Sequence, residues 1–278
     1  MKIGIIGAGT MGRGIALAFT QKEEHRVILC DLDLDLANQA LEQLKKELSK
    51  LTAKGVISST LYEPILDRIT TGTKESVTDC HLVIEAVQEK IETKKKLFVA
   101  LNSICTKQTI FASNTSSLSI TELNEDMERQ VIGLHFFNPV PLMKLVEIVT
   151  TKRTPPDLLE KMKNIVTDLG KIPVITKDHP GFVVNRILIP MINEAIGVLA
   201  SGTATAEDID LAMKLGANHP IGPLALADLI GLDVCLAIME VFLHKTKNKK
   251  YQPQELLLKM VTAGHLGRKT GKGFFTYQ

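Results

Sequence analysis

The stretch Lys2-Ile3-Gly4-Ile5-Ile6-Gly7-Ala8-Gly9-Thr10-Met11-Gly12 specifies the first pair of secondary-structure elements in this chain. An apolar run as long as a β-strand ends at Gly7, and the pattern G-x-G-x-x-G then opens an apolar helix. Here Gly7 permits a tight turn, Gly9 lets the backbone approach a pyrophosphate, and Gly12 lets helix and strand pack closely. The N–H groups at the start of the helix, around Thr10 and Met11, attract phosphate. The stretch therefore predicts a dinucleotide-binding β–α unit.

An acidic residue is the further part that such a site needs. Asp31 closes the apolar run Val27-Ile28-Leu29-Cys30, 19 residues after Gly12. A carboxylate at this place bonds the ribose hydroxyls of the adenosine and repels a 2′-phosphate, which favours NAD over NADP. Arg13, directly after the third glycine, is a basic residue, and its positive charge complicates this preference for NAD over NADP.

Outward from this unit, β-branched runs alternate with amphipathic segments up to about residue 180, which predicts an α/β fold with crossover helices. We expect a Rossmann-type, doubly wound, mostly parallel sheet over residues 1–180, with an inserted helical arm at about 36–69. After the turn cluster Asp178–Gly181 only helical patterns follow, so residues 181–278 predict a second, all-helical domain. The predicted strands are Lys2–Ile6, Arg26–Cys30, His81–Ala86, Thr109–Ser113, Val131–Phe136, Leu145–Thr150 and Ile172–Thr176, and the predicted helices of the second domain are Phe182–Ala200, Ala206–Leu215, Leu224–Leu243 and Gln254–Ala263.

The composition excludes several classes of protein. The 278 residues are 45% hydrophobic and carry a formal net charge of +2, which indicates a globular chain and neither a nucleic-acid binder nor a membrane-surface protein. The N-terminal apolar run is too short for a signal peptide, and no window is long enough for a membrane span. The four cysteines form no C-x-x-C pair, which predicts reduced structural thiols in a cytoplasmic protein and no metal site; they are Cys30, Cys80, Cys105 and Cys235.

The stretch Gly133-Leu134-His135-Phe136-Phe137-Asn138-Pro139-Val140-Pro141 places a histidine near the end of a strand, because its prolines must end that strand. Glu147 lies inside the short apolar run Leu145–Val149, where an ionised carboxylate is costly to bury without a partner. If His135 donates a ring N–H to Glu147, its tautomer is fixed and the ring becomes more basic. The two residues therefore predict a general-base pair.

Two further polar groups lie where a ligand could reach them. Ser113-Asn114-Thr115-Ser116-Ser117 follows a predicted strand, so its side chains are expected at the same sheet edge, although a helix-capping cluster is the alternative. Asn185 is a polar residue on an otherwise apolar helix, and it needs hydrogen bonds either from core backbone or from a ligand.

In combination these motifs resemble the L-3-hydroxyacyl-CoA dehydrogenases over essentially the whole chain. The length resembles that of the single-function members, which act on 3-hydroxybutyryl-CoA. The motifs that carry the resemblance are the glycine loop, Ser-Asn-Thr-Ser-Ser, His-Phe-Phe-Asn-Pro-Val-Pro, Lys-Leu-Val-Glu, Pro-Gly-Phe-Val-Val-Asn-Arg and Lys-Thr-Gly-Lys-Gly-Phe.

The resemblance implies a role for each matched position. His135 is then the catalytic base and Glu147 its orienting partner, while Ser116 and Asn185 contact the reacting oxygen of the substrate. Lys54, in a helical arm that binds CoA, is implied to contact the CoA, and Glu47 stands where some members have a serine that does so. The implied cofactor contacts beyond the glycine loop and Asp31 are Glu89, Lys94, Ser116, Asn138 and Lys269.

The implied reaction transfers a hydride between C3 of L-3-hydroxyacyl-CoA and NAD, without a metal, in the direction of fatty-acid β-oxidation or of butyrate-type synthesis. Two alternatives stay open: a dehydrogenase of a free hydroxy acid such as L-gulonate, which would not need a basic arm, and a catalytically silent NAD-binding structural protein. The apolar stretch Ile187–Ile192 exceeds what one core face requires and predicts a homodimer.

Overall fold

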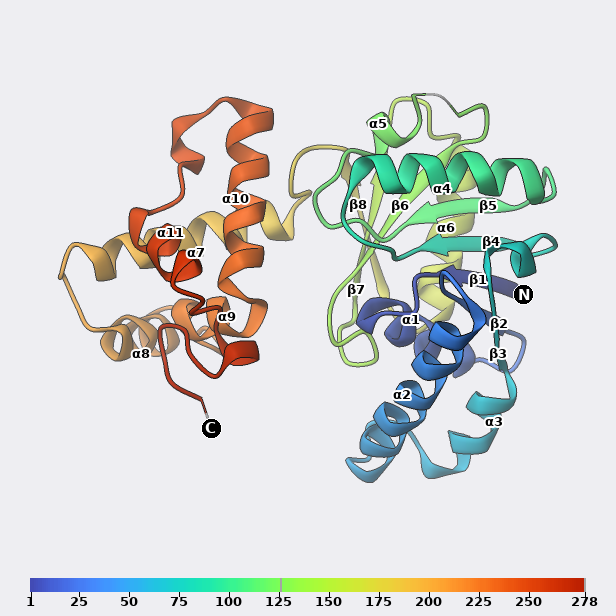
Figure 1. The fold of residues 1–278 in the computed structure, drawn as a ribbon, viewed down its shortest axis with the longest axis horizontal. Helices are drawn as coiled ribbons and strands as arrows, with labels where there is room; N and C mark the ends of the chain where they lie inside the picture. Colours follow the sequence, from blue (N-terminus) through green and yellow to red (C-terminus); the bar gives the residue numbers. More distant parts are fainter. Residues whose placement is uncertain (126, 278) are drawn as a thin grey trace. The chain divides into compact units, whose positions relative to one another are not determined.

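The computed structural model describes residues 1–125 and 127–277, which form two compact units divided after His179. The first unit contains an eight-stranded sheet of order β3-β2-β1-β4-β5-β6-β7-β8 (Figure 1). All neighbours pair in parallel except β6 and β7, which are antiparallel. The strands are β1 (Lys2–Ile6), β2 (Arg26–Cys30), β3 (Ile69–Gly72), β4 (Leu82–Glu85), β5 (Ile110–Ser113), β6 (Val131–Phe136), β7 (Leu145–Thr150) and β8 (Ile172–Lys177).

Helices cover both faces of this sheet, as expected for a doubly wound fold. One apolar core joins the strands to α1, α2 and α6, with Phe19, Leu44 and Met162 fully buried in it. On the other face Phe98 of α4 packs against Phe111 of β5, with ring centroids 5.8 Å apart. The helices of this unit are α1 (Thr10–Thr20), α2 (Leu34–Ala53), α3 (Tyr62–Asp67), α4 (Ile91–Ile104), α5 (Ile120–Leu123) and α6 (Pro156–Asp168), with short 3₁₀ turns η1 (Ser59–Leu61) and η2 (Lys74–Val77).

The predicted arm consists of α2, η1 and α3 (blue to cyan in Figure 1). Its bounds differ from the expected 36–69, because α2 begins at Leu34, where Asp33 caps the helix by accepting from the Leu36 N–H. At the other end Ile69 already belongs to β3, an edge strand that the sequence analysis did not predict. The arm therefore joins two neighbouring strands of the sheet, β2 and β3.

The second unit is helical, and no strand is assigned among its described residues, 180–277. The single helix expected over Leu224–Leu243 is wrong: Gly231, with φ of 105°, separates α9 from α10 because this conformation strains other residues. Asp228 is fully buried and accepts from the Phe274 and Phe275 N–H groups, which holds the C-terminal loop. The elements are α7 (Val184–Ala200), α8 (Ala206–Gly216), α9 (Pro223–Ile230), α10 (Leu232–Thr246), η3 (Lys249–Tyr251), α11 (Glu255–Thr262) and η4 (Arg268–Thr270).

In the part of the chain that the structure describes, no helix has the length and apolar character needed to cross a membrane.

Candidate active site

The glycine turn between β1 and α1 has the geometry that a dinucleotide requires. Gly7 has φ of 103°, and a Cβ there would lie 2.5 Å from the Ala86 carbonyl oxygen. A Cβ on Gly12 would lie 1.9 Å from the Gly7 carbonyl oxygen, so helix and turn pack too closely for any side chain. At Gly9, by contrast, a Cβ would meet no described atom within 4 Å. The turn is thus closed on its inner side and open on the side where a pyrophosphate would approach.

The helix end beside this opening offers donors to an anion. Gly9 is the N-cap residue of α1 and no side chain caps the helix, so the N–H groups of Thr10 and Met11 have no acceptor within the helix. Together with the positive end of the helix dipole they favour phosphate.

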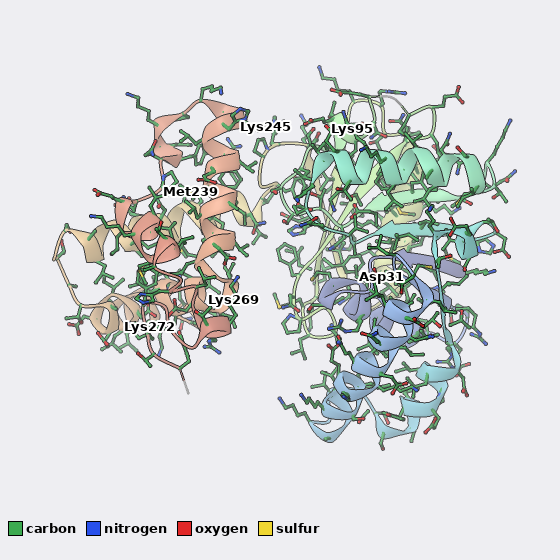
Figure 2. The ribbon with its side chains drawn as sticks, in the orientation of Figure 1. Asp31, Lys95, Met239, Lys245, Lys269 and Lys272 are labelled. Carbon is green, nitrogen blue, oxygen red and sulfur yellow. The ribbon has the colours of Figure 1, made fainter. Side chains whose placement is uncertain are left out.

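Asp31 lies directly after β2 (Figure 2), and its carboxylate accepts from the Ala8 N–H at 2.9 Å and the Leu32 N–H at 2.8 Å. The side chain is thereby fixed against the glycine turn. Gly7, Gly9 and Asp31 line one cavity of about 600 Å³ together with Leu97 and other residues of α4. The residues present therefore fit NAD, with Asp31 at the place where ribose hydroxyls would bind.

Glu89 organises the serine loop that follows β5. One oxygen, Oε1, accepts from the Thr115 hydroxyl at 2.6 Å, from the Ser116 N–H at 2.8 Å and from the Ser117 N–H at 3.1 Å. Burial works to raise the pKa of the Glu89 carboxyl, but the Lys94 ammonium and these hydrogen bonds outweigh it, so the pKa lies below its ordinary value. Glu89 and Ser116, which the sequence analysis predicted separately, thus belong to one hydrogen-bonded group.

Lys94 connects Glu89 to a second carboxylate, Glu85. The Lys94 Nζ lies 2.5 Å from Glu85 Oε1, 3.1 Å from Glu89 Oε2 and 3.3 Å from the Val87 carbonyl oxygen, and it is 1% exposed. Glu85 is fully buried, which raises its pKa against the opposing effects of Lys94 and the Ser113 hydroxyl. All three ammonium protons therefore have protein acceptors, and Lys94 is placed to hold this group together.

His135 and Glu147 form the predicted pair. They lie directly opposite each other in the register of β6 and β7, and His135 Nδ1 is 2.8 Å from Glu147 Oε2. His135 is 5% exposed and Glu147 is fully buried. Because a carboxylate only accepts, Nδ1 carries the proton and Nε2 is the basic nitrogen. Since β6 runs parallel to β5 and so to β1, His135 lies at the carboxyl edge of the sheet, as the glycine turn does.

Two asparagines lie beside this pair. Asn114, in the loop after β5, accepts from the Phe136 N–H through Oδ1 at 2.9 Å, so it fixes the end of β6. Asn138, a predicted cofactor contact, is exposed just beyond β6 at a cis peptide bond with Pro139.

In the sequence analysis Arg13 left open the choice between NAD and NADP, and Glu47 left open the contacts to CoA. In the structure the side chains of these two residues bind each other. Arg13 Nη2 and Nε lie 2.8 and 3.1 Å from Glu47 Oε1, and Nη1 donates to the Ala8 carbonyl oxygen at 3.1 Å. Arg13 is thus bonded to the arm and to the glycine turn.

Asn185 and Lys269 lie in the second unit, and their roles at the site stay predictions. Asn185 is in the first turn of α7, and Lys269 (Figure 2) donates to both carboxylate oxygens of Asp233 at 2.6 Å. Lys54, the predicted CoA contact, is exposed at the C-terminal cap of α2 in the first unit.

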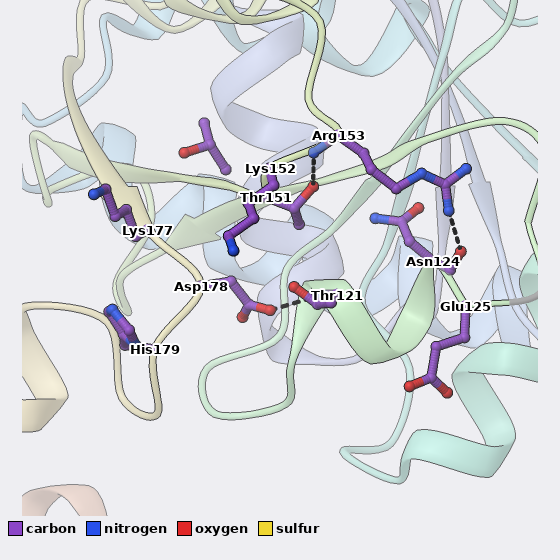
Figure 3. A pocket seen from close by; sticks show the side chains of 10 residues that line it. Thr121, Asn124, Glu125, Thr151, Lys152, Arg153, Lys177, Asp178 and His179 are labelled. Atoms are coloured by element: carbon purple, nitrogen blue, oxygen red, sulfur yellow. Dashed lines mark hydrogen bonds between the residues drawn. The ribbon is translucent and has the colours of Figure 1, made fainter.

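A larger cavity of the first unit, about 880 Å³, lies around the carboxyl ends of β7 and β8 (Figure 3). Because β7 is antiparallel to β6, these ends lie at the edge opposite to His135. Its lining residues include Lys152, Arg153 and Lys177, and none of the predicted site residues. Size alone therefore does not locate the chemistry here.

Glu85 belongs to the hydrogen-bonded group at the candidate site, and the sequence analysis missed it although a signal for it exists. It ends the buried run Leu82-Val83-Ile84, where an ionised carboxylate needs a partner for the same reason that Glu147 does. The Arg13–Glu47 pair, by contrast, joins positions 34 residues apart, and no local pattern predicts it.

Comparisons with known proteins agree along the whole chain. The family described as "3-hydroxyacyl-CoA dehydrogenase, NAD binding domain" matches residues 2–179, and the "3-hydroxyacyl-CoA dehydrogenase, C-terminal domain" matches residues 181–277. A 3-hydroxybutyryl-CoA dehydrogenase of Clostridioides difficile is 48% identical over 100% of this chain and 99% of its own length. The mitochondrial hydroxyacyl-coenzyme A dehydrogenase of Homo sapiens is 40% identical over 99% of this chain and 90% of its own.

Solved structures show the same relationship. The crystal structure of (S)-3-hydroxybutyryl-CoA dehydrogenase from Ralstonia eutropha superposes with a TM-score of 0.94 at 44% identity and covers 100% of this chain and 99% of the other. With a dinucleotide turn, a buried His–Glu pair and both family domains present, the chain belongs to the 3-hydroxyacyl-CoA dehydrogenase family.

Proposed function

We propose that this protein is an NAD-dependent dehydrogenase that interconverts L-3-hydroxyacyl-CoA and 3-ketoacyl-CoA, with a short acyl chain as in 3-hydroxybutyryl-CoA. The observation that carries the proposal is the buried His135–Glu147 pair at the sheet edge that also bears the glycine turn. An intact pair of this kind disfavours the catalytically silent alternative, because such a protein has no need to keep a buried carboxylate beside a histidine.

Proton transfer is the task of His135. Its Nε2 takes the proton from the 3-hydroxyl, while Nδ1 donates to Glu147, whose charge stabilises the imidazolium that forms. NAD, when bound, supplies the hydride acceptor. In the reverse direction the imidazolium returns the proton to the carbonyl oxygen.

Ser116 and Asn185 are the proposed ligands of the reacting oxygen. Glu89 holds the Ser116 backbone N–H at 2.8 Å, and Lys94 holds Glu89, so the loop that carries the hydroxyl is fixed from behind. Rigid placement of this kind limits the orientations of the substrate oxygen and brings C3 into line for hydride transfer.

The basic side of the arm supports an acyl-CoA over a small hydroxy acid. On α2 the apolar residues Leu44 and Leu48 face the core, so the lysines between and beyond them lie toward solvent. A CoA phosphate would find cations there, whereas a free acid such as L-gulonate has no phosphate and does not require a basic arm. The lysines are Lys45, Lys46, Lys50 and Lys54.

A direct spectrophotometric assay of NADH formation tests the substrate class. We expect NADH formation with short-chain L-3-hydroxyacyl-CoA to exceed that with long-chain thioesters, with free hydroxy acids, and with NADP in place of NAD. Lys54→Ala should raise KM for the thioester about tenfold, the value of one charge-assisted hydrogen bond, with little change in kcat. Lys107→Ala, an exposed lysine before β5 at the opposite sheet edge, is the control. Turnover of free acids equal to that of the thioesters would overturn the proposal.

A homodimer is the proposed assembly. Ile187, on α7, is 67% exposed, and Leu211 and Leu215, on α8, are 49% and 76% exposed, which is apolar surface of the kind that subunit interfaces cover. Sedimentation at micromolar concentration should give the mass of two chains, and Ile187→Glu should lower it to one. A wild-type monomer under these conditions would contradict the proposal.

We place the protein in the cytoplasm, where thiols stay reduced. All four cysteines are free and buried, and burial raises the pKa of Cys30, Cys80 and Cys235 to about 12. Such thiols are unreactive and serve as core side chains.

A further inference from the structure

A series of hydrogen bonds leads from the arm to Asp31, the carboxylate at the expected ribose site. Glu47 on α2 accepts from the Arg13 guanidinium, which also donates to the Ala8 carbonyl oxygen at 3.1 Å. The N–H of Ala8 donates in turn to Asp31 at 2.9 Å. We call Glu47, Arg13, Ala8 and Asp31 the arm–turn chain.

The Arg13 end of this chain differs from an ordinary surface ion pair. The Arg13 side chain is only 10% exposed, and two of its nitrogens converge on one oxygen of Glu47. A guanidinium held at three nitrogens has little freedom left, and its planar shape fixes the direction of each bond. The position of α2 therefore determines where Arg13 lies, and Arg13 determines where the Ala8 carbonyl lies.

The charges of the arm give the pair a second effect. Glu47 lies three residues before Lys50 and seven before Lys54, which puts it near the same side of α2. An uncompensated carboxylate there would repel a phosphate. Arg13 neutralises it while keeping its own charge away from solvent.

We propose that Arg13 is a positioning residue that fixes the arm against the glycine turn, so that binding of CoA on the arm and of the dinucleotide at the turn reinforce each other. The inference rests on the proposed function, which places CoA on the arm. Ala8 is the shared element: Asp31 holds the peptide before its Cα through the N–H, and Arg13 holds the peptide after it through the carbonyl oxygen. The two contacts together restrict the backbone dihedral angles of Ala8, so ordering either end of the chain orders the turn at this residue.

The same contacts argue against a role for Arg13 as a ligand of a 2′-phosphate. Its three bonded nitrogens face Glu47 and Ala8, and it does not line the cavity that contains Asp31. Arg13→Ala should therefore leave the ratio of NAD to NADP use within twofold of wild type.

Calorimetry of binding tests the coupling without turnover. The dissociation constant of coenzyme A is measured with and without saturating NADH, and that of NADH with and without coenzyme A. In the wild type we expect each ligand to tighten the other by about fivefold, and the two factors must agree because coupling is reciprocal. Arg13→Ala and Glu47→Ala should bring both factors to within twofold of one, whereas Glu47→Gln, which keeps the acceptor oxygen, should retain part of the coupling.

A matched control and a truncated substrate separate positioning from loss of stability. Glu160→Ala removes an exposed carboxylate that pairs with Lys163 on α6, and it should leave both factors unchanged. Arg13→Ala, which also leaves the Glu47 carboxylate uncompensated on the arm, should raise KM for the full thioester and leave that of an acyl-N-acetylcysteamine, which has no phosphate, unchanged.

Three outcomes overturn the inference. The wild type could show coupling factors of one, the variants could melt at a lower temperature and yet keep the wild-type coupling factors, or the substitution could change KM equally for the full thioester and the truncated substrate. Failure of the proposed function gives a different result, since the wild type would then not bind coenzyme A, or Lys54→Ala would bind it as tightly as the wild type.

Discussion

Replacing His135 with alanine should lower kcat by about 10³-fold while leaving NADH affinity within a few-fold of wild type. General-base catalysis contributes about 10²- to 10⁴-fold, and this substitution removes the imidazole that pairs with Glu147. The cofactor turn lies between β1 and α1, whereas His135 is on β6, so the substitution leaves the glycine turn intact. Steady-state kinetics at saturating substrate, with NADH fluorescence titration, measures both quantities.

Glu147→Gln is the companion variant for this result. The amide keeps the shape and an acceptor oxygen, so the ring stays in place, but the imidazolium loses its countercharge. We expect a loss in kcat that is smaller than that of His135→Ala. Near-full activity of His135→Ala would show that another group takes the proton.

The second large effect concerns stability. Lys94→Met should lower the free energy of unfolding by about 3–5 kcal/mol, because it leaves the Glu85 carboxylate buried without its cation. Urea denaturation followed by circular dichroism measures the loss. Affinity for NADH should fall as well, since Glu89 loses the ammonium that holds one of its oxygens.

The neighbouring residue provides the control. Lys95 pairs with Glu125 at 2.9 Å on the surface, and surface pairs contribute at most about 1 kcal/mol, so Lys95→Met should have a small effect. Adding Glu85→Gln to Lys94→Met should restore part of the lost stability by removing the unpaired charge. Equal effects of the two lysine variants would show that burial does not govern this group.

Much of the fold follows from the sequence, because continuous apolar runs predict the buried strands and amphipathic periodicity predicts the helices. The exceptions have physical causes. Ile69-Thr70-Thr71-Gly72 is too short and too polar to predict a strand alone, and it forms one because β2 offers a parallel partner. At Gly231 the helical pattern continues across the break, so only the positive φ separates α9 from α10.

The candidate site divides in the same way. Glu147 was predictable because an acid within an apolar run demands a partner, and His135 was a suitable one. The five hydrogen bonds that join Glu89 to the loop 115–117, two of them to Ser116, depend on tertiary packing. The pairing of Arg13 with Glu47 across two helices depends on it as well. Sequence patterns give the residue types at such places but not the pairs.

The antiparallel pairing of β6 with β7 has a consequence for how this site can change during evolution. His135 and Glu147 meet because their strands are in register, and the connection over 137–144 joins these strands as a hairpin. That connection can lengthen or shorten while the two side chains stay opposite each other. A single inserted residue within either strand, however, would turn Glu147 or His135 to the other face together with its apolar neighbours. Changes of length are therefore compatible with the His135–Glu147 pair in the connection and incompatible with it in the strands.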